Sequence, residues 1–192
     1  MATSMASYAG WTSLSTSTLV TRMFEHIRED WHTYHGDLSR QGLGVMLVYR
    51  FGRWRYNIKP RWLRLPFSFA YHILKLLSQI LTGIDLPCEV QVGHRLVIEH
   101  FGGIIISGDT VMGDDVIIRQ GVTIGLKHKG ISGAPVIGNR VDIGAGAKIL
   151  GAIHIGDDAV IGANAVVLHD VPPNSLAVGV PAQIKPRSHK YT

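Results

Sequence analysis

The feature that most constrains the fold is a branched aliphatic residue that returns every six positions through much of the chain. From Val136 to Val167 these residues are Ile137, Ile143, Ile149, Ile155, Ile161 and Val167. A period of six fits neither the 3.6-residue turn of a helix nor the simple alternation of a strand. Short repeats of this kind are typical of a parallel β-helix, in which each unit is a short strand and a turn and three units close one triangular coil. Coils stacked at about 4.8 Å would place the aliphatic residues inside a prism.

The same rhythm begins after Gly83, in the registers Val92, Ile98, Ile104 and Met112, Ile118, Ile124. It breaks twice, because Ile104 and Met112 are eight residues apart and Ile124 and Ile137 are thirteen apart. The second interval contains GLKHKGISGAPV, which we expect to leave the prism as a loop. Irregularities in a solenoid usually carry its function, so both breaks mark candidate sites.

The chain before Gly83 has apolar residues at helical spacing. Helices are predicted over residues 22–34, 42–56 and 66–83, the last with a proline at its start and a glycine at its end. The sequence therefore predicts a mainly β chain with an α-helical N-terminal region. We expect a flexible tail over residues 1–20, the helical region over 21–83, the β-helix over 84–184 and a C-terminal tail over 185–192.

Positive charge gathers in the helical region. The formal net charge is +5, no Asp or Glu lies between Asp37 and Asp85, and residues 50–64 combine six basic side chains with two tryptophans. This pattern indicates association with a negative surface such as a membrane face, or a helical cap whose arginines are solvated or contact another subunit. The apolar run after Leu65 is interrupted by polar residues, so we expect no transmembrane span.

The location of the protein is indicated by two further features. Residues 1–20 lack the basic start and apolar core of a secretory signal. The single cysteine, Cys88, excludes an internal disulfide framework and suits a reducing compartment, where we expect it to be a small buried thiol. We therefore expect a cytoplasmic protein, peripheral to the inner face of the membrane if the basic segment binds there.

Three stretches carry a resemblance to a known family. DVIIRQGVTIG, VDIGAGAKILGAIHIGDDAVIGANAVVLHDVPP and AVGVPAQI resemble the hexapeptide-repeat acyltransferases, and within them the serine acetyltransferase group. The resemblance implies a left-handed parallel β-helix, a homotrimer with active sites between subunits, and acetyl-CoA as acetyl donor. It also implies a catalytic pair, Asp85 in GIDLP and His100 in EHFGG.

Acetyl transfer to an alcohol requires such a pair. A base must remove the hydroxyl proton as the oxygen attacks the thioester, and histidine titrates near neutral pH. A carboxylate on the far ring nitrogen fixes the tautomer and stabilises the imidazolium. We therefore assign His100 as the general base and Asp85 as the group that orients it.

The acetyl-CoA site is also implied by the resemblance, along the side of the prism. Candidates are the small residues Gly125, Ala145, Gly146, Ala163 and Gly179, with Lys148, Lys185 and Arg187 as partners of the phosphates. Alanine and glycine are also the residues that a tightly stacked coil requires, so these positions have a structural explanation as well.

The acceptor is where the sequence departs from the serine enzymes. Glu99 stands where they carry Asp, and their loop Arg-His pair falls at Gly133 and Ala134. A serine carboxylate needs a positive partner, so we expect a sugar hydroxyl of a surface polysaccharide or its precursor, with serine as the alternative. Glu99 and His128, the latter in the projecting loop, are the candidate acceptor-binding residues.

The sequence argues against two other classes of function, a zinc enzyme and a non-catalytic scaffold. Carbonic anhydrases of the γ class share this prism and bind zinc through three histidines, but His128 and His154 do not provide the third ligand beside His94 and His100, so we expect no metal. A non-catalytic trimeric scaffold would have no reason to keep Asp85 and His100. No nucleic-acid partner is expected.

Overall fold

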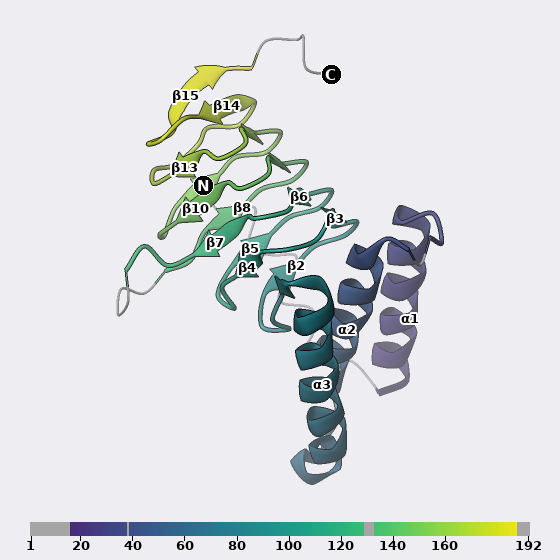
Figure 1. Ribbon diagram of the computed structural model, residues 1–192. Coiled ribbons are helices and arrows are strands. Elements are labelled where there is room, and N and C mark those ends of the chain that lie inside the picture. Colours follow the sequence, from purple (N-terminus) through teal and green to yellow (C-terminus); the bar gives the residue numbers. More distant parts are fainter. Residues whose placement is uncertain (1–15, 38, 129–132, 188–192) are drawn as a thin grey trace.

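The computed structural model describes residues 16–37, 39–128 and 133–187. It confirms the predicted fold, a left-handed parallel β-helix preceded by an α-helical region. Figure 1 shows the stacked coils of the prism, with the helices gathered at its first-coil end and the C-terminal strands at the other. Residues 1–15 of the predicted flexible tail lie outside the described residues. The prediction was wrong for residues 16–20, which belong to a helix.

Three helices form the N-terminal region: α1 (Thr16–Thr33), α2 (Gln41–Arg55) and α3 (Arg61–Thr82). The predicted start of α3 at Pro66 was wrong, because the helix begins at Arg61 and Pro66 lies inside its second turn. Pro66 has no N–H to donate to the Trp62 carbonyl, so the helix continues past it with one backbone hydrogen bond fewer. The predicted end is confirmed: Gly83 has φ 66°, and its N–H bonds the Gln79 carbonyl at 2.8 Å.

The strands of the prism form three sheets, one on each side. Sheet A contains β1 (Ile84–Asp85), β4 (Ile104–Ile106), β7 (Thr123–Gly125), β10 (Lys148–Leu150) and β13 (Val166–Val167). Sheet B contains β2 (Gln91–Val92), β5 (Val111–Met112), β8 (Val136–Ile137) and β11 (His154–Ile155). Sheet C contains β3 (Val97–Glu99), β6 (Ile117–Arg119), β9 (Asp142–Ile143), β12 (Val160–Ile161), β14 (Ser175–Val178) and β15 (Gln183–Pro186).

The six-residue markers fill the prism as predicted. None of the six residues from Ile137 to Val167 is more than 2% exposed. Regular coils pair 18 residues apart, as Ile149 does with Val167. Met112 pairs with Ile137, 25 residues on, so the chain between β7 and β8 adds seven residues to an 18-residue coil. The additional residues fall where the loop was predicted, and residues 129–132 of that segment lie outside the described residues.

The first break was placed wrongly by the sequence. Ile106, rather than Ile104, pairs with Ile124, so the regular six-residue step runs from Ile106 to Met112. The two additional residues lie between Ile98 and Ile106 instead. Counting could not decide this, because Ile104 and Ile106 are both buried and either could serve as the marker. The correction matters for function, since the lengthened corner carries His100.

The first coil has no coil beneath it, and three buried tyrosines of the helical region bond its backbone. The Tyr34 hydroxyl accepts the N–H of Ile98 at 2.7 Å and donates to the Leu96 carbonyl at 3.3 Å. Tyr49 donates to the Val90 carbonyl, and Tyr71 accepts the Cys88 N–H. These hydroxyls satisfy groups that would otherwise be buried without partners. We call the three side chains the tyrosine cap.

The opposite end is closed by β15. It pairs antiparallel with β14, whereas the other strand pairs of the prism are parallel. The strand covers an edge that would otherwise present unpaired backbone groups. The sequence prediction placed a tail from residue 185, and β15 extends to Pro186.

The basic segment over residues 50–64 is partly internal. Arg50 is 7% exposed and its Nε lies 2.9 Å from the Asp30 carboxylate, and Arg55 is 5% exposed and donates to Ser68. Less of the positive charge therefore reaches the surface than the sequence indicated, and membrane contact stays a prediction. Among the described helices, none is both long and apolar enough to cross a membrane. Cys88 is buried, as predicted.

Candidate functional site

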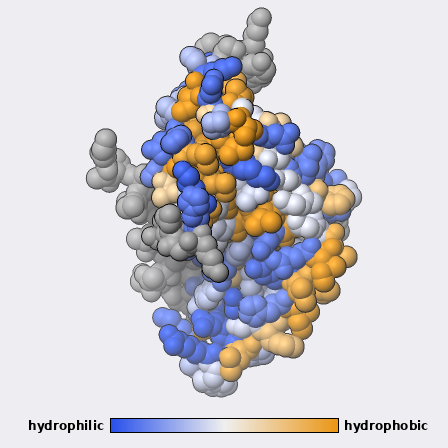
Figure 2. All heavy atoms as spheres, turned by 60° about the vertical axis from the view of Figure 1, so that its left-hand side comes forward, coloured by the Kyte–Doolittle hydropathy of each residue, from blue (hydrophilic) through white to orange (hydrophobic). Residues whose placement is uncertain are grey.

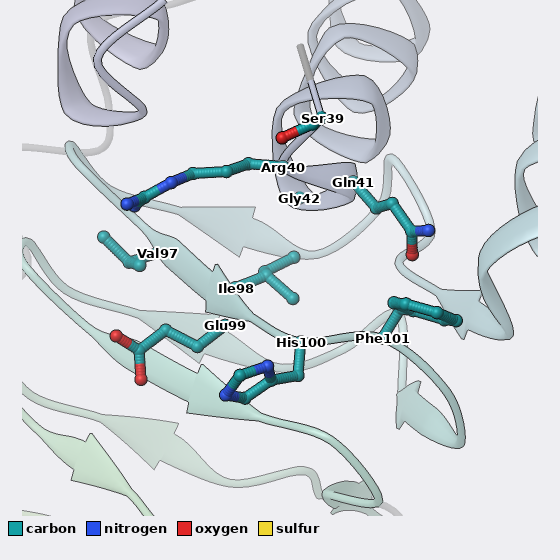
Figure 3. A pocket seen from close by; sticks show the side chains of 9 residues that line it. All are labelled: Ser39, Arg40, Gln41, Gly42, Val97, Ile98, Glu99, His100 and Phe101. Atoms are coloured by element: carbon teal, nitrogen blue, oxygen red, sulfur yellow. The ribbon is translucent and has the colours of Figure 1, made fainter. Parts of the chain in front are cut away.

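A pocket of about 390 Å³ lies where the start of α2 meets the end of β3. It is lined by Ser39, Arg40, Gln41, Gly42, Val97, Ile98, Glu99, His100 and Phe101. Figure 3 shows Glu99 and His100 side by side on the prism, with Arg40 and Gln41 facing them from the helix. The volume is in the range of sites for small molecules.

His100 occupies the lengthened corner between sheets C and A. Its backbone lies in the left-handed region, with φ 62°, and Gly102 and Gly103 follow with φ 102° and 68°. These conformations let the corner accommodate its two additional residues while β4 returns to the interior with Ile104. The imidazole is exposed, and it makes no hydrogen bond to a residue in the described ranges.

Glu99 is held by a ladder of charges on the outer face of sheet C. Arg119, its neighbour in the next coil, approaches the Glu99 carboxylate to 3.0 Å and also bonds Asp142. The hydrogen bond that Arg119 donates to Asp142, together with the charge of the Asp142 and Glu99 carboxylates, raises the pKa of Arg119. Since Glu99 is anchored beside His100, the pocket presents a carboxylate next to an imidazole.

Asp85 lies on the outer face of β1, opposite Ile105 in the next coil. Its Oδ1 is 3.2 Å from Lys75 Nζ, but the geometry is not that of a hydrogen bond and this buried oxygen has no hydrogen-bond partner among the described residues. The predicted bond between Asp85 and His100 is not formed here. The structure leaves the pairing of these two side chains as a prediction.

The predicted acetyl-CoA residues share a corner with His100. Backbone hydrogen bonds stack this corner coil upon coil, from Gly121 N to Gly102 O, from Gly146 N to Gln120 O and from Asn164 N to Ala145 O, each at 2.8–2.9 Å. Gly179 continues the column, since its carbonyl accepts the Val166 N–H. Ala145, Gly146, Ala163 and Gly179 therefore form a strip of small residues that leads away from His100 along the prism.

The remaining predicted residues are more scattered. Lys148 donates to the Gly121 carbonyl and to Thr123, so its amine is engaged within the prism. Arg187 donates to the Asp158 carbonyl at 3.0 Å, while Lys185 is exposed on β15. Gly125 ends β7, and His128 is exposed where the loop leaves the prism. The structure neither brings these four side chains and Gly125 to one point nor tests their roles.

Sequence reasoning missed the helical wall of the pocket. Ser39 and Arg40 directly precede α2 and Gln41 begins it. These residues stand nearly sixty positions before Glu99 in the chain, and no spacing rule joins them to the prism. Gly42 supplies the only local signal: a Cβ there would lie 2.6 Å from the Tyr34 hydroxyl and 2.7 Å from the Ile98 carbonyl. Only glycine lets α2 approach β3 this closely.

Known proteins share the hexapeptide repeats and the fold of this chain. A family model described as bacterial transferase hexapeptide (six repeats) matches residues 134–169. A serine acetyltransferase of Helicobacter pylori (strain J99) is 43% identical over 144 residues, covering 74% of this chain and 80% of the relative. One of Mycobacterium tuberculosis is 48% identical over 110 residues, covering 56% of this chain and 47% of the relative.

Two solved structures show the same fold. Serine acetyltransferase of Brucella abortus strain S19, in complex with coenzyme A, superposes with a TM-score of 0.73 at 28% identity and covers 88% of this chain and 70% of that chain. Serine acetyltransferase of Neisseria gonorrhoeae, in complex with serine, superposes with a TM-score of 0.72 at 28% identity and covers 88% of this chain and 72% of that chain. These likenesses include the helical region as well as the prism.

Proposed function

Because this chain belongs to the serine acetyltransferase family, we propose that it transfers the acetyl group of acetyl-CoA to the hydroxyl of serine. The enzyme is an acyltransferase and acetyl-CoA is its co-substrate. The observation that carries the proposal is the position of His100, in a small pocket at the foot of the strip of small residues. Serine takes precedence over the saccharide that the sequence favoured, because the relatives are named for serine and one solved relative holds it.

The reaction needs one proton transfer in each direction. A ring nitrogen of His100 accepts the proton of the serine hydroxyl as the oxygen attacks the thioester carbonyl carbon. The new C–O bond forms, the C–S bond breaks, and the departing CoA sulfur takes the proton back from the imidazolium. The products are O-acetylserine and CoA, and His100 returns to its neutral form.

Asp85 is proposed to orient the imidazole during this cycle. Its buried Oδ1 has no hydrogen-bond partner among the described residues, so it can accept a ring N–H. Catalytic hydrogen bonds often close only when substrate binds. Lys75 Nζ forms an ion pair with the same oxygen at 3.2 Å.

The pocket offers an opposite charge for each end of an amino acid. Glu99 suits the ammonium group, and the Arg119 ladder fixes its position. Arg40 at the first turn of α2 suits the carboxylate, which the loop Arg-His pair would otherwise hold. The backbone N–H groups at the start of α2 add partial positive charge on the same side. Arg40 therefore compensates for Gly133 and Ala134.

The acetyl-CoA chain is proposed to lie along the strip from Gly102 to Gly179. Small side chains allow a ligand to lie close to the backbone. At one position of the strip the stacking itself requires glycine, because a Cβ at Gly146 would lie 2.1 Å from Asn164 Oδ1. Lys185 and Arg187 are the proposed partners of the phosphates. They belong to the last coil, on and after β15, but lie toward the opposite edge of sheet C, where Lys185 pairs with Leu176 and Arg187 bonds the Asp158 carbonyl. Lys148 acts through its hydrogen bonds to the coil below.

A homotrimer is proposed as the working assembly. Along α3 a series of large apolar side chains is at least 38% exposed: Trp62, Leu63, Leu65, Phe67, Phe69, Ile73, Leu74, Leu76, Leu77, Ile80 and Leu81. Figure 2 shows hydrophobic residues along the lower right of the molecule, the level of α3 in Figure 1. A patch of this size on a single chain indicates a partner, and neighbouring subunits of the prism would cover it.

The acceptor is tested by thiol release from acetyl-CoA with serine beside a panel of sugars and oligosaccharides. We expect efficient turnover on serine and background rates on saccharides. The reverse result would mean that Gly133 and Ala134 mark a changed acceptor pocket and would support the saccharide. CoA binding without turnover on any alcohol would support the scaffold.

Two variants test the residue roles. We expect His100→Ala to lower kcat by at least about a hundred-fold while CoA binding persists, because general-base catalysis contributes about 10²–10⁴. His154→Ala, exposed on β11, is the matched control. Arg40→Gln should raise the KM for serine and leave the KM for acetyl-CoA unchanged, whereas Arg140→Gln, an exposed arginine on another corner, should change neither. Near-normal turnover by His100→Ala would contradict the mechanism.

A further inference from the structure

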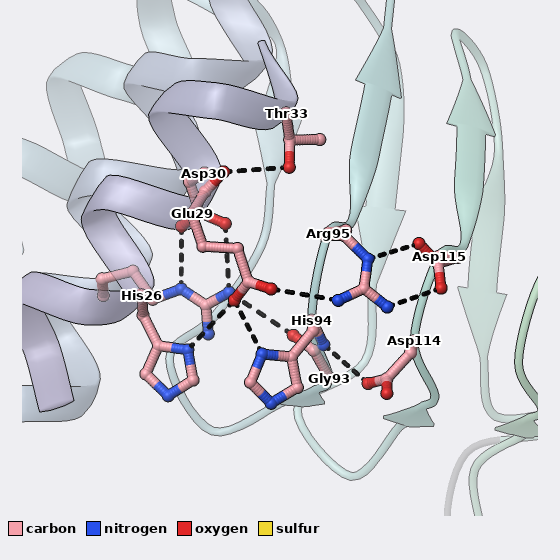
Figure 4. A network of polar contacts seen from close by, with 10 residues as sticks. His26, Glu29, Asp30, Thr33, Gly93, His94, Arg95, Asp114 and Asp115 are labelled. Atoms are coloured by element: carbon pink, nitrogen blue, oxygen red, sulfur yellow. Dashed lines mark hydrogen bonds and ion pairs between the residues drawn. The ribbon is translucent and has the colours of Figure 1, made fainter.

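A second group of chemically capable side chains lies outside the pocket, at the seam between α1 and the prism. His26 and Glu29 stand three residues apart on α1, and His94 follows β2 in the first coil. One donor atom from each of the three lies within 4.8 Å of the others. Figure 4 shows both imidazoles directed toward the Glu29 carboxylate from the two sides of the seam.

The distances between the donor atoms of these three side chains can be compared with those around a bound metal ion. Glu29 Oε2 is 2.7 Å from His94 Nδ1 and 3.8 Å from His26 Nδ1, and the two rings are 5.0 Å apart between centroids. Ligands of tetrahedral Zn²⁺, at about 2.0–2.1 Å from the ion, are about 3.3 Å from one another. The two distances from Glu29 Oε2 lie on either side of this value, and the donor atoms of the two imidazoles lie within 4.8 Å of each other. Small movements of the side chains would therefore bring the three donors around one ion.

The surroundings fix the carboxylate as they do in metal proteins. Arg95 donates to the second oxygen, Glu29 Oε1, at 3.0 Å, and is itself held by two hydrogen bonds of 2.6 and 2.7 Å to Asp115. Metal-binding carboxylates are commonly hydrogen-bonded in this way by an outer group. The backbone N–H of His94 donates to Asp114, which positions the second imidazole.

The charge balance also allows a cation. The two nearby guanidinium groups are each paired with a carboxylate, Arg50 with Asp30 and Arg95 with Asp115. Glu29 and Asp114 remain as additional negative charge beside the two imidazoles. Two imidazole nitrogens and one carboxylate oxygen form a donor set that suits Zn²⁺ and its transition-metal neighbours rather than Ca²⁺ or Mg²⁺.

We propose that His26, Glu29 and His94 bind one divalent transition-metal ion, with Zn²⁺ as the favoured ion, and that this ion fastens α1 to the first coil. Water completes the coordination. The site is separate from His100, so it serves the joint between helices and prism and takes no part in the acetyl transfer. Sequence reasoning considered His94 only with other histidines of the prism and missed its partners, since Glu29 lies 65 residues away in the chain.

The test uses the full chain without an affinity tag, stripped of metal with a chelator. Zn²⁺ binding is measured by titration calorimetry against a competing chelator, and Co²⁺ binding by visible absorption, which reports a four-coordinate nitrogen and oxygen site. We expect one ion per chain and a rise in Tm on adding Zn²⁺. His94→Ala and Glu29→Gln should each weaken binding by more than the about 10- to 100-fold that loss of an outer group costs.

The matched control is His32→Ala, an exposed histidine on the same helix outside the cluster, which should bind as the wild type does. Thiol-release activity of each variant at saturating substrates shows whether it is folded. Wild-type protein that binds no Zn²⁺ would overturn the proposal. Equal binding by the wild type and the active His94→Ala variant would also overturn it, because the ion would then lie elsewhere.

Discussion

The tyrosine cap makes a direct prediction about what holds the first coil closed. Tyr34→Phe removes one oxygen and leaves the ring in place. Tyr34 is 1% exposed, and the backbone groups that its hydroxyl serves belong to Leu96 and Ile98, which are 0% and 3% exposed. Both the Ile98 N–H and the Leu96 carbonyl lose a partner in a place that water does not reach.

The magnitude follows from the two orphaned groups. An unsatisfied buried donor or acceptor costs about 1–3 kcal/mol, and the longer of the two bonds, at 3.3 Å, contributes less than the 2.7 Å bond. We therefore expect Tyr34→Phe to lower the free energy of unfolding by about 2–4 kcal/mol. No cavity term adds to this, because the ring remains.

Urea unfolding at a fixed protein concentration measures the effect, since assembly makes stability depend on concentration. Tyr56→Phe is the control: Tyr56 is 41% exposed and its hydroxyl donates to Glu89 at 2.8 Å, so its loss should cost less than about 1 kcal/mol. If Tyr34→Phe unfolds within about 0.5 kcal/mol of the wild type, the coil edge does not depend on the cap and the reasoning fails.

Three further predictions concern packing, charge and pH. Gly144→Ala should unfold at a markedly lower urea concentration than the wild type, because the new Cβ would lie 2.6 Å from the Ala163 backbone nitrogen in the next coil. Gly44→Ala, on a helix surface with nothing within 4 Å of the new Cβ, should stabilise the fold by about 0.4–1 kcal/mol. Equal effects of the two substitutions would contradict this. Asp30→Asn should lower the free energy of unfolding by about 3–5 kcal/mol, because it leaves Arg50 charged and buried. Asp158→Asn, at an exposed ion pair, should lower the urea midpoint much less, and neither change should alter the slope of the urea transition. Burial raises the pKa of each tyrosine of the cap above its ordinary value near 10, so the folded chain keeps protons that the unfolded chain releases. Stability is therefore full below about pH 10 and falls above it by about 1.4 kcal/mol per pH unit for each tyrosine, and Tyr34→Phe should show a shallower decline; an identical pH profile would exclude this origin.

The prism was predictable because its rule is local. Each coil needs a small or branched residue at the same position, so the pattern repeats in consecutive six-residue units. It can be recognised without knowing how the rest of the chain folds. Helix ends were harder to predict. Gly83 has the left-handed backbone that its position requires. Pro66 misled the prediction, because the helix begins at Arg61 and carries this proline in its second turn.

The site was only half predictable. His100 and Glu99 follow from the resemblance and lie together in the pocket, whereas Arg40 and Gln41 reach it from a different element. No periodic pattern in the sequence connects α2 with β3. The close packing of these two elements depends on Gly42 lying against Tyr34. Counting residues also could not show that Ile106, and not Ile104, continues the six-residue series. Both isoleucines are buried, and only the strand pairing distinguishes them.

The lengthened corner at His100 has a consequence for how this enzyme can change. In a solenoid each coil contacts only its neighbours. The two additional residues disturb only one coil, since pairing between residues 18 apart resumes at Ile106. Alterations there need not propagate to the coils that carry the strip of small residues. With the proposed roles of the His100 corner in acceptor binding and of the strip in acetyl-CoA binding, mutations can change the two functions independently.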